Sequence, residues 1–355
     1  MMTKSVYIHI PFCSNICAYC DFCKLFYTKK WIKPYLESLK KEIISKYRGD
    51  VIETIYIGGG TPSCLSLDEL KILFDIIDIF KTDLKEFTFE CNIEDINDEL
   101  LEFLKNTNVN RLSIGLESTK RKNLEYLGRK YSTDFKEKIE LACKYFDNIN
   151  VDLIYALKTE SLKDLEDDLD FLISMNIKHI STYSLIIENH TKFRNEKNID
   201  EDLDYEMYKL INKKLANYHH YEVSNFCLEG YEAKHNLVYW NNDRYYGFGL
   251  GASGFIDDIR YDNNRNILEY INGKYLKEYE KLEKYEDMQN EMILGLRKLD
   301  GVSKKKFYLK YGKKIEDVFD IRELLDSKKL IDDGKYIYIS SDYIYLSNEI
   351  LINFV

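Results

Sequence analysis

A short apolar strand that runs straight into a cysteine-rich loop constrains this chain more than any other stretch. Residues 6–10 (Val-Tyr-Ile-His-Ile) are rich in β-branched side chains, which predicts a buried strand. Pro11 cannot donate to a sheet hydrogen bond, so we expect the strand to end there. The loop that follows carries Cys13, Cys17 and Cys20, spaced Cx3Cx2C. Thiolates this close together at a strand end are typical metal ligands.

Three nearby thiols are compatible with more than one kind of site. They can hold three irons of a [4Fe-4S] cluster and leave the fourth iron open to a small ligand. They can also hold structural zinc, with Cys23 or His9 completing a tetrahedron. A disulfide framework is not expected, because the chain is long and no secretory signal is evident. Cys23 falls outside the three-cysteine spacing, and we interpret it as a bystander.

Composition narrows the class of protein. The 355 residues carry a formal net charge of −10, which argues against a general binder of nucleic acid or of membrane surfaces. No stretch approaches the roughly 18 apolar residues of a membrane span. The first predicted strand begins almost at the N-terminus, so we expect no targeting peptide and a cytoplasmic protein. The length suits one large α/β domain and a small second one.

Strands and helices alternate along the first 220 residues. Apolar periodicity predicts strands at 6–10, 51–57, 87–91, 111–114, 150–155 and 179–187, with amphipathic helices between them. This alternation predicts βα units around a parallel sheet, and six such units indicate an open, partial (β/α)6 barrel. Chemistry in such a fold lies at the carboxyl ends of the strands.

Glycines and charged residues fall at these strand ends. Residues 58–61 (Gly-Gly-Gly-Thr) follow the second strand, where glycines let a ligand approach the backbone, and a plain tight turn is the alternative. Glu90, Glu117 and Asp152 belong to the next three strands, and Arg129 lies between them in sequence. A charge buried at a strand end needs a partner, so either structural ion pairs or a bound ligand account for these residues.

Taken together, the motifs from Tyr7 to Asp152 resemble the radical S-adenosylmethionine (SAM) superfamily, and within it the oxygen-independent coproporphyrinogen III dehydrogenase family. The resemblance implies that Cys13, Cys17 and Cys20 ligate a [4Fe-4S] cluster. It also implies that SAM is bound by residues at the strand ends. These residues are Tyr7, Gly59, Gly60, Thr61, Glu90, Glu117, Arg129 and Asp152.

The sequence departs from that family's pattern at three places. Glu117 occupies a position that is usually glutamine, and Asn92 is not followed by the usual proline. Residues 155–158 (Tyr-Ala-Leu-Lys) lack the usual glycine and proline. An acid in place of an amide adds a charge where a donor is usual, so these departures imply an altered SAM affinity.

A second motif, His-Asn-Leu-Val-Tyr-Trp at 235–240, separates two branches of this family. A histidine among aromatics can be ordinary packing, but histidine is also an axial ligand of haem iron, and aromatics can cover a porphyrin face. Together with Asp21-Phe22 after the last cluster cysteine, the motif resembles the HemW-type haem chaperones. The dehydrogenases instead tend to carry Cys-x-Cys there, after a longer N-terminal segment. The resemblance covers nearly the whole chain and implies that His235, Tyr239 and Trp240 contact haem.

Near residue 278 the pattern changes to helices followed by a hairpin. Helices are predicted at 288–296, 303–311 and 318–325, and paired strands at 336–339 and 343–346. We therefore divide the chain into a radical SAM barrel (1–220), a connecting segment (221–277) and a small winged-helix-like domain (278–355). Acidic residues offset the lysines of the last domain, which favours a lid or docking role over DNA binding.

Two functions from different classes fit these features. The first is a haem chaperone that holds a [4Fe-4S] cluster, SAM and haem and passes the haem to an acceptor protein. It would act as a monomer or homodimer, with any membrane contact made through the acceptor. The alternative is an enzyme that cleaves SAM reductively and decarboxylates coproporphyrinogen III. The short N-terminus, Asp21 and the 235–240 motif favour the chaperone. A zinc-stabilised scaffold is a third interpretation. The sequence does not determine whether SAM is cleaved or whether haem is attached covalently.

Overall fold

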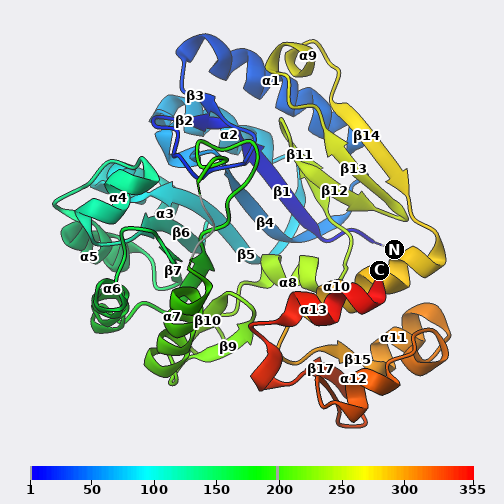
Figure 1. The fold of residues 1–355 in the computed structure, drawn as a ribbon. Helices are drawn as coiled ribbons and strands as arrows, with labels where there is room; N and C mark the ends of the chain where they lie inside the picture. The colour runs from blue at the N-terminus through cyan, green and yellow to red at the C-terminus, as the bar shows by residue number, and fades with distance from the viewer. Residues whose placement is uncertain (1, 197–199) are drawn as a thin grey trace.

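The computed structural model describes residues 2–196 and 200–355 and is organised around a nine-stranded sheet. The strand order is β11-β1-β4-β5-β6-β7-β8-β10-β9, and every neighbouring pair from β11 to β8 is parallel. Helices cover the outside of this curved sheet (Figure 1). The partial-barrel prediction is confirmed. The central strands are β1 (Ser5–Ile10), β4 (Val51–Gly59), β5 (Lys81–Asn92), β6 (Arg111–Glu117), β7 (Ile149–Tyr155) and β8 (His179–Ser184).

The helices between these strands pack apolar faces against the sheet. Two of them begin at a serine whose side chain and backbone exchange hydrogen bonds with the third helical residue, at Ser66 and Ser161. Two helices lie between β6 and β7, and the first of them ends at Gly128 with φ +70°. The helices are α1 (Lys29–Lys46), α2 (Leu67–Ile77), α3 (Asp98–Lys105), α4 (Arg121–Leu127), α5 (Phe135–Tyr145), α6 (Leu162–Ser174) and α7 (Glu201–Lys214).

The segment that was predicted to connect the two domains and to carry the 235–240 motif also contributes strands to the main sheet. β9 (His219–Glu222) and β10 (Asn225–Cys227) extend it antiparallel beyond β8, and β11 (Tyr246–Phe248) pairs with β1 at the other edge. A separate antiparallel sheet follows, with strands β12, β13 and β14. Its strands and the nearby helices are β12 (Ser253–Ile256), β13 (Ile259–Asn263), β14 (Leu276–Lys281), α8 (Lys234–Trp240) and α9 (Ile267–Ile271).

The C-terminal residues have an apolar core of their own and combine short helices with a three-stranded sheet of order β15-β17-β16. The predicted pairing of 336–339 with 343–346 is wrong. β17 pairs instead with β16 on its N-terminal side, through a turn at Asp333-Gly334, where Gly334 has φ +86°. An Asp-Gly pair is a strong hairpin signal that the prediction overlooked. The elements are α10 (Lys284–Gly295), β15 (Val302–Ser303), α11 (Lys304–Tyr311), α12 (Arg322–Asp326), β16 (Leu330–Asp332), β17 (Tyr336–Ile339) and α13 (Ser347–Leu351).

The helices of residues 2–196 and 200–355 include none with the length and apolar character needed to cross a lipid bilayer.

Candidate functional site

The cysteine loop is closed at its base by backbone pairing. β2 (Phe12–Cys13) pairs in parallel with β3 (Leu25–Phe26), so residues 14–24 form a loop beyond the end of β1. The N–H of Gly60 donates to the Ile10 carbonyl at 2.8 Å, which ties the loop to the end of β4. These contacts fix both ends of the cysteine loop against the sheet, and the backbone of residues 14–24 determines how far apart the three thiols lie.

The sulfurs of Cys13, Cys17 and Cys20 do not all lie within 4.8 Å of one another. Among residues 2–196 and 200–355, the one trio of potential ligand atoms within 4.8 Å of one another lies elsewhere. A tetrahedral zinc with sulfur ligands would need sulfurs about 3.8 Å apart, whereas a cube of irons takes each thiolate at a separate corner. Burial raises the pKa of the Cys13 thiol to about 11, so a bound cation must displace its proton. The spacing favours an iron–sulfur cluster over zinc.

Close packing explains the glycine stretch after β4. A Cβ on Gly58 would lie 2.6 Å from the Glu90 carboxyl carbon, and one on Gly59, which has φ +114°, would lie 2.5 Å from the His9 ring. A Cβ on Gly60 would meet the backbone of the cysteine loop at 2.7 Å. Larger residues would push the loop away from the sheet, so the glycines serve the fold as well as any ligand.

The amides of this stretch are already used within the chain. The Gly59 N–H donates to Glu90 Oε2 at 2.9 Å, and those of Gly60 and Thr61 donate to carbonyls of residues 10 and 12. An anion would therefore find no free donors here. A cationic ammonium group suits the stretch better, because the Glu90 carboxylate lies beside it.

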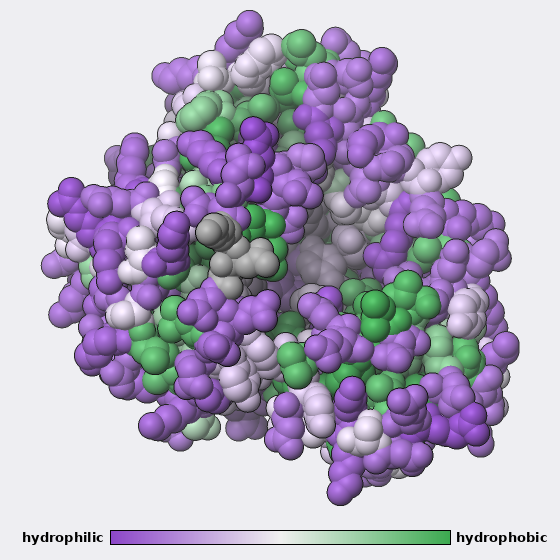
Figure 2. Space-filling view, viewed as in Figure 1, coloured by the Kyte–Doolittle hydropathy of each residue, from purple (hydrophilic) through white to green (hydrophobic). Residues whose placement is uncertain are grey.

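A cavity of about 770 Å³ opens inside the barrel, and the molecular face in Figure 2 is hollowed near its centre, over strand β1 of Figure 1. The cavity collects part of the predicted site. The predicted residues that line it are Tyr7, Cys20, Glu90, Glu117, Asp152 and Tyr239. Cys17 and Arg129 line a small hollow of about 200 Å³ on the other side of the cysteine loop.

Two hydrogen bonds orient Tyr7 at the floor of the cavity. The His9 Nε2 atom donates to the Cys23 carbonyl at 2.7 Å, which leaves Nδ1 to accept from the Tyr7 hydroxyl at 2.9 Å. Burial lowers the pKa of His9 to about 4, so the ring is neutral and this arrangement holds at ordinary pH. Cys23 therefore contributes its backbone carbonyl, and this contact does not require its thiol to be a metal ligand.

Buried carboxylates line one wall of the cavity. Glu90 accepts from the Tyr56 hydroxyl at 2.7 Å, and burial raises the pKa of Glu90 to about 7. Asp152 accepts from the Asn150 amide at 2.8 Å, and burial raises its pKa as well. The guanidinium of Arg111 opposes both rises, and its Nε has no hydrogen-bond partner among the described residues. This wall suits a ligand that carries positive charge and hydroxyl groups.

Glu117 and Arg129 form a buried ion pair beside the cysteine loop. Arg129 Nη1 lies 2.9 Å from Glu117 Oε1 and 4.0 Å from the sulfur of Cys17. Glu117, an acid where the family usually has an amide, is thus paired with the cation Arg129. This is the structural ion pair that the sequence offered as the alternative to ligand binding. Burial still raises the pKa of Glu117 to about 7, and its Oε2 is buried without a partner in the described part of the chain. That oxygen is a free acceptor for a ligand hydroxyl.

The structure places His235 away from the cavity. Its side chain is fully buried, with Nδ1 3.0 Å from Thr54 Oγ1 and Nε2 2.9 Å from the Tyr239 hydroxyl. Burial lowers the pKa of His235 to about 3, so the ring is neutral. Both ring nitrogens are engaged, and neither is presented to a haem iron in this conformation. His235 instead fixes Tyr239, which does reach the cavity wall.

Trp240, the last residue of the 235–240 motif, faces the C-terminal elements. The Arg297 guanidinium lies 5.8 Å from the centre of its ring, and the Trp240 carbonyl approaches Gly295 of α10. The three residues of the motif thus have different roles: His235 is a buried anchor, Tyr239 lines the cavity and Trp240 contacts α10. Helical spacing explains why Trp240 differs, because positions 235 and 239 lie on one face of α8, where their side chains meet, and position 240 lies on another.

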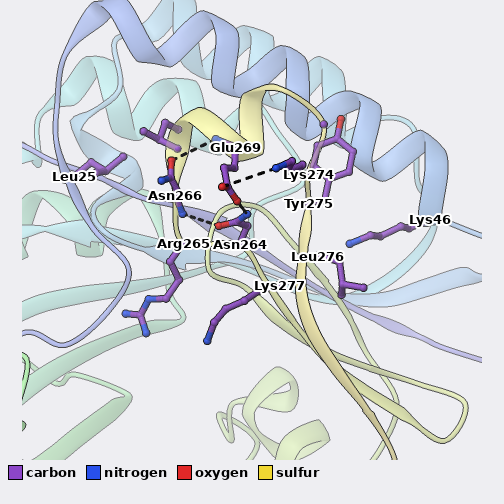
Figure 3. Close-up of a pocket in the computed structure, with 12 residues that line it drawn as sticks. Leu25, Lys46, Asn264, Arg265, Asn266, Glu269, Lys274, Tyr275, Leu276 and Lys277 are labelled. Carbon is purple, nitrogen blue, oxygen red and sulfur yellow. Dashed lines mark hydrogen bonds and ion pairs between the residues drawn. The ribbon is translucent and has the colours of Figure 1, made fainter.

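A second, more open hollow of about 950 Å³ lies between α1, α9 and β14 (Figure 3). It contains none of the residues predicted for the site. Its cations are partly paired within the chain, as Lys274 is with Glu269 at 4.0 Å. Arg265 borders this hollow and also the central cavity, and its Nη2 donates to the Asp21 carbonyl at 3.0 Å.

Sequence reasoning missed Arg111 and Arg265. An arginine that opens a strand of otherwise apolar residues was a usable signal for Arg111. Arg265 gave no comparable signal, because it lies in a loop 244 residues away from Asp21, the residue of the cysteine loop to which it donates.

Comparison with known proteins identifies the family of this chain. The Radical SAM superfamily model matches residues 7–172, and the HemN C-terminal domain matches residues 282–347. The heme chaperone HemW of Lactococcus lactis subsp. lactis is 39% identical, over 99% of this chain and 97% of that protein. HemW of Bacillus subtilis is 37% identical, over 98% of both chains, and HemW of Escherichia coli is 31% identical, over 91% of this chain and 89% of its own.

A solved structure shows the same fold. The radical SAM enzyme coproporphyrinogen III oxidase (HemN) from Escherichia coli superimposes with a TM-score of 0.86, covering 99% of this chain and 90% of that one. The identity of 19% limits this likeness to architecture. Radical SAM proteins carry a [4Fe-4S] cluster and SAM, and the spread thiols, the ammonium-compatible stretch and the free Glu117 oxygen fit both groups. The chain belongs to the HemW family of the radical SAM superfamily.

Proposed function

We propose that this protein is a haem chaperone that binds a [4Fe-4S] cluster, SAM and haem and delivers the haem to an acceptor protein. Cys13, Cys17 and Cys20 would hold the cluster, which supplies an open iron that SAM can chelate. The relatives named HemW support the haem function, and the cavity supports a bulky ligand in addition to SAM. We expect the protein to work in the cytoplasm.

The observation that carries the haem proposal is the apolar rim of the cavity. Three large side chains at the rim are unusually exposed: Phe22 at 67%, Ile186 at 69% and Tyr183 at 41%. Apolar side chains gathered around an opening mark a ligand or partner site. A porphyrin is a flat apolar ring with carboxylates on one edge, and Arg265 at the same opening suits those carboxylates.

Within this function, the SAM-contacting residues divide by charge. Glu90 and the carbonyl groups near it would receive the SAM ammonium, and Glu117 Oε2 and Asp152 would accept from hydroxyl groups. Arg129 already neutralises Glu117, so any contact it makes with the SAM carboxylate would be shared with that ion pair. Tyr7 would lie against the sulfonium end, and Gly59, Gly60 and Thr61 would support the methionyl end.

SAM affinity is expected to rise with pH because Glu90 must ionise to bind an ammonium group. In the protein without SAM, burial raises the pKa of Glu90 to about 7. The neutral Glu90 carboxyl therefore contributes to the stability of the fold at low pH, and this contribution is lost as the pH rises through 7. If only the ionised form binds well, affinity should increase about 10-fold from pH 6 to pH 8. Anaerobic calorimetry on cluster-loaded protein measures this change.

Glu90→Gln is expected to bind SAM more weakly at pH 8 and with a flatter pH profile. Glu99→Gln, at an exposed position of α3 away from the cavity, serves as the matched control and should keep the wild-type slope. An unchanged slope in Glu90→Gln would assign the titration to another group.

The geometry of His235 predicts an indirect effect on haem. His235→Ala releases the Tyr239 hydroxyl, so haem affinity should fall by about 10-fold or less, the range of one hydrogen bond. Because His235 presents no nitrogen to the cavity, the Soret maximum and the electron paramagnetic resonance signal of bound haem should stay unchanged. Tyr239→Phe should behave alike. A shifted spectrum in His235→Ala alone would instead make His235 an axial ligand after rearrangement.

The second candidate function is the coproporphyrinogen III dehydrogenase reaction, favoured by the shared fold with HemN. It is tested by incubating cluster-loaded protein with SAM, dithionite and coproporphyrinogen III and analysing the porphyrins by chromatography. The chaperone proposal expects no decarboxylated product. Product formed over several turnovers would replace the proposal with the dehydrogenase.

A further inference from the structure

We propose that β9, β10 and the loop before α8 form a second metal site, specific for zinc or a similar transition metal, with His219, Cys227 and Glu232 as its protein ligands. It lies at the far edge of the main sheet, whereas the cysteine loop lies near β2 and β3 (Figure 1). Metal binding at this site does not depend on haem binding.

The fold brings the three residues together from three elements. Cys227 on β10 is the register partner of His219 on β9, and directly opposed residues of antiparallel strands project to the same face. Glu232 reaches them from the loop 228–233, and its Oε1 lies 3.1 Å from His219 Nδ1. Their nitrogen, sulfur and oxygen atoms all lie within 4.8 Å of one another.

The loop is held in place by contacts outside the trio. The Leu228 N–H donates to the Lys178 carbonyl at 2.8 Å, and the Ala233 N–H donates to the Tyr221 hydroxyl at 3.3 Å. These bonds fix the backbone on both sides of Glu232. The site is therefore largely formed in the absence of a ligand, which lowers the cost of binding one.

The donor set selects the class of metal. One thiolate, one imidazole and one carboxylate suit zinc and its neighbours, whereas calcium and magnesium prefer oxygen ligands. Three protein ligands leave a fourth tetrahedral position, and the His219 side chain is 48% exposed, so water can occupy that position.

A purely structural cluster is the competing explanation, since His219 and Glu232 already share a hydrogen bond. Cys227, however, is completely buried with its sulfur beside the Glu232 carboxylate. The trio thus offers a sulfur, a nitrogen and an oxygen to one point, which the hydrogen bond between His219 and Glu232 alone does not require. On binding, the thiol proton leaves to solvent, a sulfur–metal bond forms and hydration water is released, with no change of oxidation state.

The site would anchor the start of α8. Glu232 precedes this helix by two residues, and α8 carries Asn236 and Tyr239 of the central cavity. A metal bound to β9, β10 and this loop would therefore hold the helix that forms part of the cavity wall.

The test uses the full chain with its cluster already reconstituted, so that the cluster cysteines are occupied. After incubation with zinc sulfate and removal of excess metal, elemental analysis should find one zinc per chain with unchanged iron. Cobalt(II) in place of zinc should give a thiolate-to-cobalt absorption band in the near ultraviolet.

Cys227→Ser should lower zinc affinity by about 100-fold or more and abolish the cobalt band, since even outer-shell changes cost 10–100-fold. His219→Gln and Glu232→Gln should also lower zinc affinity. Because they alter exposed or partly exposed residues, they provide the test if Cys227→Ser folds poorly. Cys143→Ser and His190→Gln, at exposed positions, are the matched controls and should keep it. No zinc in the wild type, or full zinc retention in Cys227→Ser and His219→Gln, would overturn the proposal.

Discussion

Replacing Cys17 with serine is expected to abolish the iron–sulfur absorption of the reconstituted protein while leaving its fold intact. A hydroxyl is a poor ligand for iron in a cluster, and three thiolates give no redundancy once one is lost. Cys17 is partly exposed in a loop outside the apolar core, so the change creates no core cavity. Iron content should fall from four atoms per chain to near zero, with an unchanged circular dichroism spectrum.

Cys23→Ser and Cys143→Ser are the controls for this prediction. Cys23 lies close to the cluster cysteines but is used through its carbonyl, and Cys143 is exposed on α5. Both variants should retain four irons. Loss of iron in Cys23→Ser would add that residue to the ligands, and a cluster retained in Cys17→Ser would contradict the assignment.

The second large effect is expected from the rim of the cavity. The double variant Phe22→Ser, Ile186→Ser removes the two most exposed apolar side chains at the opening. Covering each with a porphyrin should contribute about 1–2 kcal/mol, so haem affinity should fall about 30-fold or more. Fluorescence quenching by added haem measures the dissociation constant, and cluster content should not change.

Two exposed isoleucines that lie away from the cavity serve as controls for the rim substitutions. Ile44→Ser and Ile352→Ser change side chains that are 61% and 70% exposed but lie away from the cavity. Their haem affinity should equal that of the wild type. Equal losses in rim and control variants would mean that haem binds the surface non-specifically.

Local patterns were sufficient to predict the barrel and the strand ends that border its cavity. Each strand of the barrel is a short apolar run, and the cysteines, the glycines and Glu90 follow such runs directly, so sequence position alone placed them at strand ends. The strand boundaries were less exact, as with β5, whose charged first residues extend it beyond the predicted 87–91.

What could not be predicted depends on contacts between distant segments. The role of His235 on α8 is set by Thr54 on β4, and no local pattern shows that both ring nitrogens are occupied. The short strands β9 to β11 are each three or four residues long and gain stability only from the sheet they join. Arg265 reaches the cavity from the same distant part of the chain.

The most direct test of the central claim is a haem titration of the cluster-loaded protein, followed anaerobically in the Soret region. We predict saturable binding of one haem per chain, retained when SAM is present and unaffected by removal of dithionite. A cluster-loaded protein that shows no saturable haem binding would contradict the assignment of this chain as a haem chaperone.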